Sequence, residues 1–229
     1  MGGAHAVAAL AYGTESIERV DVIAGPGNLY VQEAKRQCSS DVGIDGFAGP
    51  SDVLVVATNG SDPDVASLDL AAQAEHGPGT IVVAASDDPA FLDAIEFDPG
   101  EAVAALVDVP DMEAGLALAD EFAPEHLELV GAAEEALAPR VRSAGCVFVG
   151  LSGATAFGDY VAGSNHCLPT GGAARFASGL SARHFRRRMS EVRIGDAAAA
   201  LAAAGVPIAE AEGFAWHARS MALRQTKAP

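Results

Sequence analysis

Two residues of a short polar segment, 73–76 (QAEH), have the types and the spacing of metal ligands. Gln73 and His76 are three positions apart, so on a helix both side chains leave the same face. An amide oxygen and an imidazole placed in this way can bind one metal ion. A polar helix end with a capping histidine would show the same pattern, and this pair alone does not decide between the two.

A second segment, 122–129 (FAPEHLEL), joins a carboxylate to an imidazole. Pro124 disfavours helical backbone at Ala123 and stiffens the approach to a strand, where Glu125 and His126 follow each other. Such a pair can transfer protons, because histidine titrates near neutral pH and burial can raise the pKa of a carboxyl group. Two solvated residues at a strand edge are the alternative.

Two further segments add candidate ligands. Glycines bracket Asp159 and His166 in 157–170, a stretch that is too irregular for a regular element and typical of a functional loop. His217 ends the segment 212–217 (EGFAWH), where it also fits a plain helix face. The four candidate ligands offer nitrogen and oxygen atoms and no thiolate, which suits zinc or manganese. They are Gln73, His76, Asp159 and His217.

Two turns also have functional potential. The turn 25–28 (GPGN) follows a strand-like run and opens a helix, so its backbone N–H groups can hold an anion such as a dinucleotide phosphate. It lacks the full glycine fingerprint of dinucleotide-binding proteins and is a weak signal by itself. The tight loop 48–52 (AGPSD) precedes a strand, and we expect it to expose the hydroxyl group of Ser51.

The elements that must position these residues alternate between strands and helices. We expect strands at 20–24, 53–57, 80–85, 127–130 and 146–150, and helices at 6–11, 29–38, 62–76, 89–95, 112–122 and 132–144. This rhythm predicts an α/β fold in which a mostly parallel sheet has helices on both faces. The pattern from 180 onward, which includes an alanine-rich helix at 197–204, predicts a small helical tail.

Composition excludes several classes of protein. The 229 residues are 50% hydrophobic, enough to bury a core, and the net charge is −17 at pH 7. So acidic a chain is unsuited to binding nucleic acid or an anionic membrane surface. Its few lysines and its excess of acidic residues suit a cytoplasm of high salt concentration, as in a halophile. Three cysteines without a CxxC motif argue against a disulfide scaffold. No apolar run approaches the roughly 20 residues of a membrane span, so we expect a cytoplasmic protein.

Seven segments, in the same order along the chain, resemble histidinol dehydrogenase. The series runs from the first residues to the tail and is far more specific than any single motif. The segments are 2–15 (GGAHAVAALAYGTE), 25–37 (GPGNLYVQEAKRQ), 44–57 (IDGFAGPSDVLVVA), 73–76, 122–129, 158–170 (GDYVAGSNHCLPT) and 212–217. The resemblance implies a zinc- and NAD-dependent oxidoreductase of histidine biosynthesis, which oxidises L-histidinol through histidinaldehyde to L-histidine.

The resemblance also assigns roles to the candidate residues. The implied zinc ligands are Gln73, His76, Asp159 and His217, and the metal would orient the substrate. His126 would accept the proton of the alcohol, and Glu125 would activate the water that attacks the aldehyde. The implied substrate contacts are Ser51, Gln73, His76, His126, Asp159, His166, Glu212 and His217, and the implied NAD contacts are Asn28 and His5.

The sequence departs from the family pattern at two of the matched segments. His5 stands where the family usually has a glutamine that contacts NAD, and an imidazole can still donate a hydrogen bond there. Asp52 replaces the usual glutamate after Ser51, which is a change of one methylene group and should be mild.

Length is the largest departure, because family chains are close to twice as long and this chain matches their C-terminal portion. The resemblance implies three parts: 1–52 from an NAD-contacting Rossmann-like domain, 53–179 as the second half of the zinc-binding catalytic one, and 180–229 as a helical tail. In the family homodimer the tail crosses to the partner, so Glu212 and His217 would complete the other subunit's site. We expect incomplete sheets with unpaired strand edges, and a marginally stable chain whose activity is left open.

Two other functions remain as alternatives. The chain could belong to a related dehydrogenase of another polar alcohol, although His166 and Glu212, at the substrate-recognising positions, argue against this. It could also be a non-catalytic remnant that binds zinc. Turnover of different alcohols separates the first alternative, and zinc content with and without the missing half separates the second.

Overall fold

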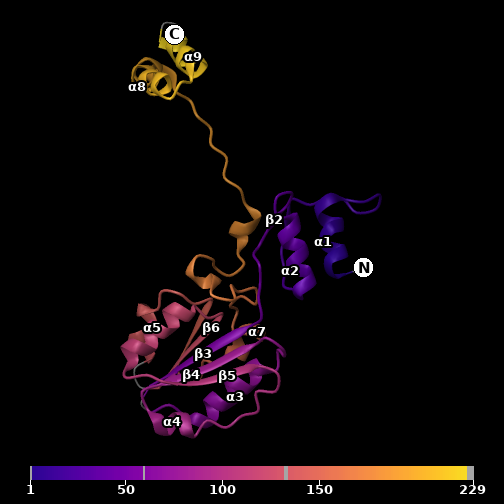
Figure 1. Cartoon of the computed structure of the whole chain (residues 1–229), viewed down its shortest axis with the longest axis vertical. Coiled ribbons are helices and arrows are strands. Elements are labelled where there is room, and N and C mark those ends of the chain that lie inside the picture. Colours follow the sequence, from indigo (N-terminus) through magenta and orange to yellow (C-terminus); the bar gives the residue numbers. More distant parts are fainter. Residues whose placement is uncertain (1, 59, 132–133, 226–229) are drawn as a thin grey trace. The chain divides into compact units, whose positions relative to one another are not determined.

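The computed structural model of the protein describes residues 2–58, 60–131 and 134–225. They form two compact units, Met1–Arg186 and Arg187–Pro229, which are described separately (Figure 1). The fold is α/β with mostly parallel strands, as the sequence predicts. None of the helices in the described ranges is both long enough and apolar enough to cross a membrane.

A five-stranded parallel sheet forms the centre of the first unit. Its strands are β3 (Asp52–Ala57), β4 (Ile81–Ser86), β5 (Val103–Asp108), β6 (His126–Val130) and β7 (Cys146–Val149). Their spatial order is β5-β4-β3-β6-β7, so the chain begins at the centre, builds one side and then returns to build the other. The central pair is in register with Val53 opposite His126, which brings the amino ends of β3 and β6 together.

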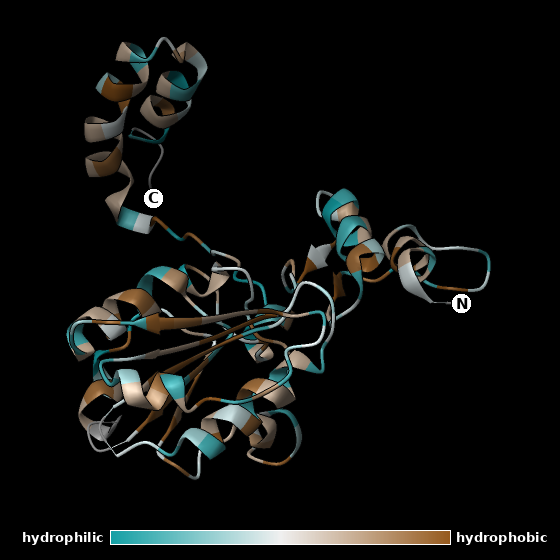
Figure 2. Ribbon diagram, turned by 60° about the horizontal axis from the view of Figure 1, so that its bottom comes forward, coloured by the Kyte–Doolittle hydropathy of each residue, from teal (hydrophilic) through white to brown (hydrophobic). Residues whose placement is uncertain are grey.

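Helices cover both faces of this sheet, and alternate residues of β3 explain why. Val53 and Val55 pack toward α3 (Pro63–Ala74) and α4 (Pro89–Asp93), whereas Leu54 and Val56 pack toward α5 (Met112–Phe122) and α6 (Glu134–Leu137). A strand that is buried on both sides must be apolar throughout, as a continuous run of valine, leucine and alanine is. Figure 2 shows these apolar strands between the covering helices.

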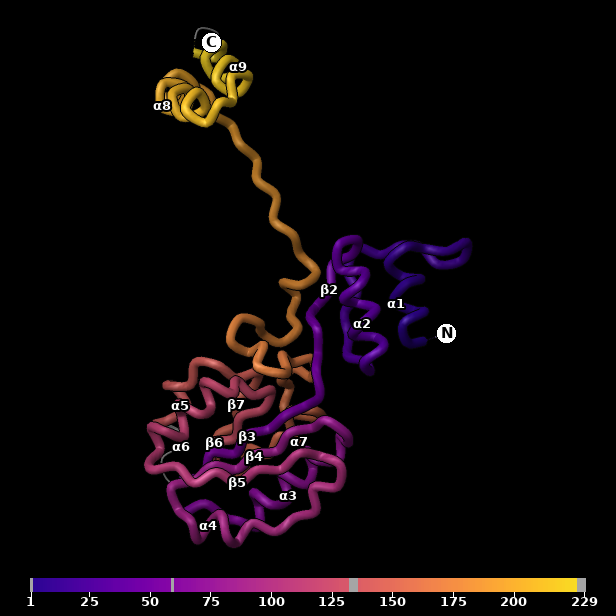
Figure 3. Tube along the Cα trace, in the orientation of Figure 1, coloured from indigo at the N-terminus to yellow at the C-terminus, as the bar shows by residue number. Residues whose placement is uncertain are grey.

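A smaller parallel sheet precedes the large one. It comprises β1 (Val22–Ile23) and β2 (Gly43–Ile44), with α1 (Gly3–Tyr12) and α2 (Leu29–Cys38) packed beside them. Its core is small and consists of Val7, Ala11, Ile23, Cys38 and Val42. The chain then runs directly from β2 into β3 (Figure 3).

The second unit is a pair of packed helices, α8 (Ala198–Ala211) and α9 (Ala215–Gln225). Small residues allow close approach: a Cβ added at Gly205 would lie 2.7 Å from the sulfur of Met221. Ala202, Ala209 and Ala218 are buried in this unit.

Most expected elements are found within two or three residues of their predicted bounds, and 29–38 and 112–122 coincide with α2 and α5. The structure adds β2, β5 and α7 (Thr155–Tyr160), which the sequence patterns did not indicate. The helix expected at 132–144 is much shorter, because only α6 and a 3₁₀ turn, Ala138–Arg140, form there. Residues 132–133 of that prediction lie outside the described ranges. Before α8, the tail has 3₁₀ turns at Ala182–Phe185 and Gly195–Ala197 and otherwise irregular backbone.

Candidate active site

A cavity of about 800 Å³ opens at the amino ends of the central strands. Ser51, Thr80 and Glu125, which line it, directly precede β3, β4 and β6. Ligands of doubly wound sheets usually bind at the opposite, carboxyl edge. Here α3 runs back along the sheet and its C-terminal end, the negative end of the helix dipole, reaches the amino edge, where it favours cations.

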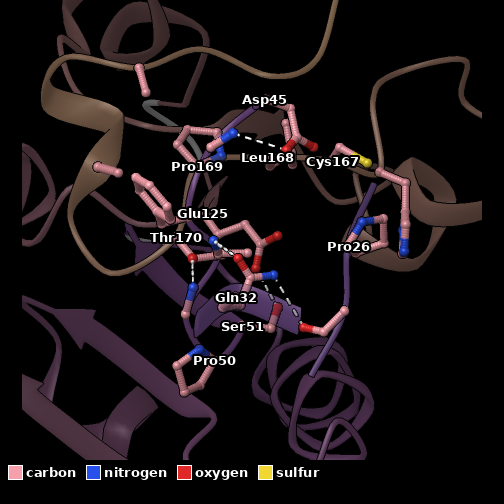
Figure 4. Close-up of a pocket in the computed structure, with 18 of the residues that line it drawn as sticks. Pro26, Gln32, Asp45, Pro50, Ser51, Glu125, Cys167, Leu168, Pro169 and Thr170 are labelled. Carbon is pink, nitrogen blue, oxygen red and sulfur yellow. Dashed lines mark hydrogen bonds between the residues drawn. The ribbon is translucent and has the colours of Figure 1, made fainter. Parts of the chain in front are cut away.

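A chain of three polar side chains joins α3 to the start of β6. Gln73 Nε2, near the end of α3, donates to Ser51 Oγ, and Ser51 Oγ donates to Glu125 Oε2. Figure 4 shows Ser51 and Glu125 directed toward each other in the cavity. The loop pattern predicts an exposed hydroxyl group at Ser51, and this prediction is wrong. Ser51 is half-buried, and its hydroxyl group is hydrogen-bonded to Gln73 and Glu125.

Burial dominates the electrostatics of Glu125. It raises the pKa of this carboxyl group from 4.5 to about 7, and the nearby negative charges of Asp52 and Asp159 contribute to the rise, against the hydrogen bond from Ser51. A carboxyl group with such a pKa exchanges protons readily at neutral pH.

His126 is also buried, with 3% of its surface exposed, and its ring lies 5.8 Å from that of Phe148. Burial lowers its pKa, and the charge of Asp159 opposes this effect, so the ring is neutral at neutral pH. Its Nδ1 has no hydrogen-bond partner among the described residues and lies 3.8 Å from Glu125 Oε2. The acid/base pair that the sequence suggests is therefore placed together in the cavity.

The three candidate metal ligands of the first unit lie near this pair. His76 and Asp159 line the cavity. The Nδ1 atom of His76 bonds the carbonyl oxygen of Gln73 at 2.9 Å, so it must carry the hydrogen, and Nε2 remains an acceptor. Asp159, on α7, bonds Nδ1 of His166 at 2.9 Å, and the side chain of His166 is 60% exposed.

The two candidate residues of the tail belong to the second unit, where both are exposed. Glu212 is the C-cap of α8, and His217 lies on α9 with its ring 5.3 Å from that of Phe214. Within the described ranges, no group of three or more histidine, cysteine, aspartate or glutamate side chains is gathered for a metal ion. The four-ligand set predicted from the sequence is thus divided between the two units.

The turn 25–28 lines the other end of the same cavity. Asn28 caps α2 by accepting the N–H of Val31 at 3.2 Å. His5, the other predicted NAD contact, is exposed on α1 and is not one of the residues that line the cavity.

Sequence reasoning missed the buried ion pair that holds this turn. Lys35 Nζ donates to Asp45 Oδ1 at 2.6 Å and to the carbonyl oxygen of Gly25, while Asp45 Oδ2 accepts the N–H of Gly25 at 2.7 Å. The signal was available, since Lys35 is one of only two lysines and falls on the apolar side of an expected helix. It also missed Asp52, which was noted only as a departure from a pattern.

Comparison with known proteins places the chain in a family. The family model of histidinol dehydrogenase matches residues 1–225. The chain is 47% identical to histidinol dehydrogenase of Rhizobium meliloti (strain 1021), with 98% of this chain and 56% of the relative covered. It is 44% identical to histidinol dehydrogenase of Pseudomonas aeruginosa PAO1, with 98% and 55% covered.

Structure comparison gives the same result. The crystal structure of histidinol dehydrogenase from Elizabethkingia anophelis superimposes with a TM-score of 0.87 at 33% identity, over 98% of this chain and 56% of that one. The chain therefore spans somewhat more than half the length of these relatives. A match that extends over nearly the whole sequence, together with a shared fold, shows that this chain belongs to the histidinol dehydrogenase family.

Proposed function

We propose that this chain carries the proton-transfer site of a dehydrogenase that oxidises L-histidinol through histidinaldehyde to L-histidine, with zinc and NAD. The observation that carries the proposal is the buried pair of Glu125 and His126 at the cavity. A raised carboxyl pKa and a lowered imidazole pKa give two groups that can each accept a proton near neutral pH.

His126 is the proposed base of the first oxidation. In the proposed tautomer the hydrogen of the neutral ring is on Nδ1, which lies 3.8 Å from Glu125 Oε2, so that Nε2 accepts the proton of the substrate hydroxyl group. Closer approach of Glu125, now 3.8 Å from Nδ1, stabilises the imidazolium that results.

Glu125 is the proposed base of the second oxidation. Its ionised carboxyl group removes a proton from the water that adds to the aldehyde carbon. Ser51 fixes Oε2 of Glu125 with its hydroxyl group, so the other carboxyl oxygen, Oε1, is the one left to bind the water.

The donors of the first unit suit zinc in chemistry. His76 keeps Nε2 as an acceptor, Asp159 supplies a carboxylate, and Gln73 supplies the amide oxygen that its bond to Ser51 leaves available. When bound, zinc would orient the substrate, and NAD would take a hydride in each oxidation. Glu212 and His217 would complete the site from a partner subunit, while Asn28 and His5 would contact NAD and His166 the substrate.

Four further properties of the protein stay predictions alongside this proposal. They are the homodimer with shared sites, the cytoplasmic location, the choice of zinc over manganese, and the domain boundaries at 52 and 179.

Turnover of the purified chain tests the proposed function. The chain is supplied with zinc, NAD and histidinol or histidinaldehyde, and NADH formation is followed. We expect His126→Gln to slow histidinol oxidation about 10²–10⁴-fold, and Glu125→Gln to slow chiefly histidinaldehyde oxidation. Glu113→Gln, an exposed glutamate paired with Arg140, is the control that should change neither rate.

Each alternative has its own outcome in this assay. Faster turnover of another polar alcohol than of histidinol would assign a different substrate. Stoichiometric zinc without turnover, even when the missing half of a family chain is supplied in trans, would identify a non-catalytic remnant. Robust turnover by this chain alone would show that the missing half is not needed.

A further inference from the structure

Asp52, the first residue of β3, lies directly behind the proposed active site. Its side chain is 3% exposed and is not among those that line the cavity. Its Oδ1 accepts the backbone N–H of Glu125 at 2.6 Å, and its Oδ2 accepts the N–H of Gly171 at 3.3 Å. A buried carboxylate that is bound through both oxygens to backbone donors holds two distant parts of the chain in place.

The first part is the backbone that leads into β6. The carbonyl oxygens of Pro124 and Glu125 accept the N–H groups of Gly145 and Cys146 at 2.8 Å each, which fixes this backbone toward β7. Its other side faces β3, where the bond to Asp52 is made. The preceding Ala123 has a left-handed backbone, with φ of 52°, so the local chain is not held by a regular element.

The second part is the wall of the cavity formed by 167–170. Thr170 Oγ1 accepts the N–H of Gly49 at 2.5 Å, and Gly171 follows it with its N–H on Asp52. Asp52 therefore connects the backbone of Glu125 to the loop that carries His166.

Neighbouring residues thus hold Glu125 at both ends. Asp52 binds its backbone N–H, while Ser51 donates to its carboxyl group. This arrangement leaves the side chain of Glu125 little freedom to turn away from the cavity. The charge of Asp52 also contributes, after burial, to the raised pKa of Glu125.

We propose that Asp52 is a positioning residue for Glu125, whose carboxylate fixes the backbone at Glu125 and Gly171 and so directs the carboxyl group of Glu125 into the cavity. The inference rests on the proposed function, because it serves the step assigned to Glu125. The contact itself is tested without turnover.

Amide hydrogen exchange, measured by NMR on the full 229-residue chain, tests the contact. In Asp52→Asn, the amide group can accept only one of the two N–H groups, so exchange at 125, at 171 or at both should accelerate about tenfold or more. Asp52→Glu restores the carboxylate and should restore protection. Asp120→Asn is the control for the change of carboxylate to amide, since Oδ1 of Asp120 alone accepts the N–H groups of Arg142 and Ser143, at 2.8 and 3.1 Å, and the amide oxygen of asparagine can keep both bonds.

The control should leave exchange nearly unchanged at 142 and 143 as well as at 125 and 171. Unchanged exchange at both 125 and 171 in Asp52→Asn overturns the proposal. If that variant does not fold, the unsubstituted chain decides: a coupling across the hydrogen bond, from the amide nitrogen of Glu125 to the carboxyl carbon of Asp52, is expected. Its absence, when the same coupling between Arg142 and Asp120 is seen, overturns the proposal.

Kinetics separate positioning from a general structural role. We expect Asp52→Asn to lower kcat with histidinaldehyde about tenfold or more, with a smaller change in kcat with histidinol and in either KM. Equal losses with both substrates contradict the positioning role. If the unsubstituted chain oxidises neither substrate, even with the missing half of a family chain supplied in trans, the proposed function fails, while the exchange measurement still decides whether Asp52 holds Glu125.

Discussion

Burial makes two glutamates harder to ionise: Glu125, directly before β6, and Glu128, in the middle of it. Burial raises the pKa of Glu125 to about 7 and that of Glu128 to about 8, and in Glu128 the charge of Asp69 adds to the effect. The exposed Glu113 shows the opposite change, because its hydrogen bond to Arg140 lowers its pKa. The same type of side chain therefore keeps its proton up to about neutral pH where it is buried, and loses it at a pH below its usual pKa where it is paired with an arginine at the surface.

This difference predicts how stability depends on pH. The folded state raises the pKa of Glu125, so its contribution to stability is present below the unfolded pKa of 4.5 and is lost as pH rises through about 7. Glu125→Gln removes this loss. Relative to the unsubstituted chain, the variant should gain about 3 kcal/mol of unfolding free energy between pH 4.5 and 8.5, measured by urea denaturation.

Glu113→Gln serves as the control of opposite sign. Its stabilising ionised form is lost in the variant, so this variant should lose stability relative to the unsubstituted chain as pH rises. A Glu125→Gln variant whose relative stability does not change with pH would contradict the burial of an acidic Glu125.

The sequence predicts candidate site residues correctly where residues that lie close together in space are also close together in the sequence. Glu125 and His126 are adjacent in sequence, and Gln73 and His76 share a helix end, so their proximity is already encoded in the spacing. Asp52 and Glu125 are 73 positions apart and meet through a side chain and a backbone N–H. Such a bond leaves no periodic signal, and the pattern gave Asp52 no role.

At the scale of elements, α7 illustrates the same limit. It has six residues and no side-chain cap of its own, and its first N–H, on Thr155, is accepted by Glu128 of β6 at 3.0 Å. A helix whose N-terminal cap comes from a distant strand has no capping residue of its own in the sequence, so the sequence pattern predicts an irregular loop there. The strand β5 (VAALVD) was also missed: two of its six residues are alanines, which favour strands weakly, and pairing with β4 supports the strand form there.

The cap on α7 can be tested by two substitutions at Glu128. Glu128→Gln keeps an oxygen for the N–H of Thr155 and should change the unfolding free energy by less than about 1 kcal/mol. Glu128→Leu leaves that buried N–H without an acceptor and should cost about 1–3 kcal/mol. Equal stability of the two variants in urea denaturation would mean that the bond does not hold α7.

At the scale of the whole molecule, the large sheet has an exposed apolar edge strand, β5. Within the described ranges, β5 pairs with β4 alone, and Val103 and Leu106 are 61% and 48% exposed. An apolar edge strand favours association with another chain.

Substitution of a residue of β5 tests whether this edge strand promotes association between chains. Leu106→Lys should lower the fraction of self-associated chain several-fold at a given concentration, because a charged side chain opposes pairing between edges. Leu68→Lys, at an exposed leucine of α3, is the control and should have little effect. Sedimentation or light scattering measures the self-association of both variants. A larger effect of Leu68→Lys than of Leu106→Lys would show that the chain associates through a surface other than β5.

Net charge acts on the whole molecule as well. With −17 charges, self-repulsion opposes the compact state, and salt screens it. We expect the unfolding temperature to rise by about 5 °C or more between 0.1 and 1 M KCl. A flat or falling unfolding temperature would remove the support for a salty cytoplasm.

The pairing of β3 with β6 has one more consequence. His126 stands opposite Val53 at the first rung of that ladder, and directly before this rung Ser51 and Asp52 both contact Glu125. A slip of one residue would turn His126 to the other face of the sheet and leave the hydroxyl of Ser51 facing the wrong neighbour. Chains with the wrong register would lack the assembled pair of Glu125 and His126. If the chain has the proposed activity, its turnover per molecule would therefore be proportional to the fraction of chains that folded in the correct register.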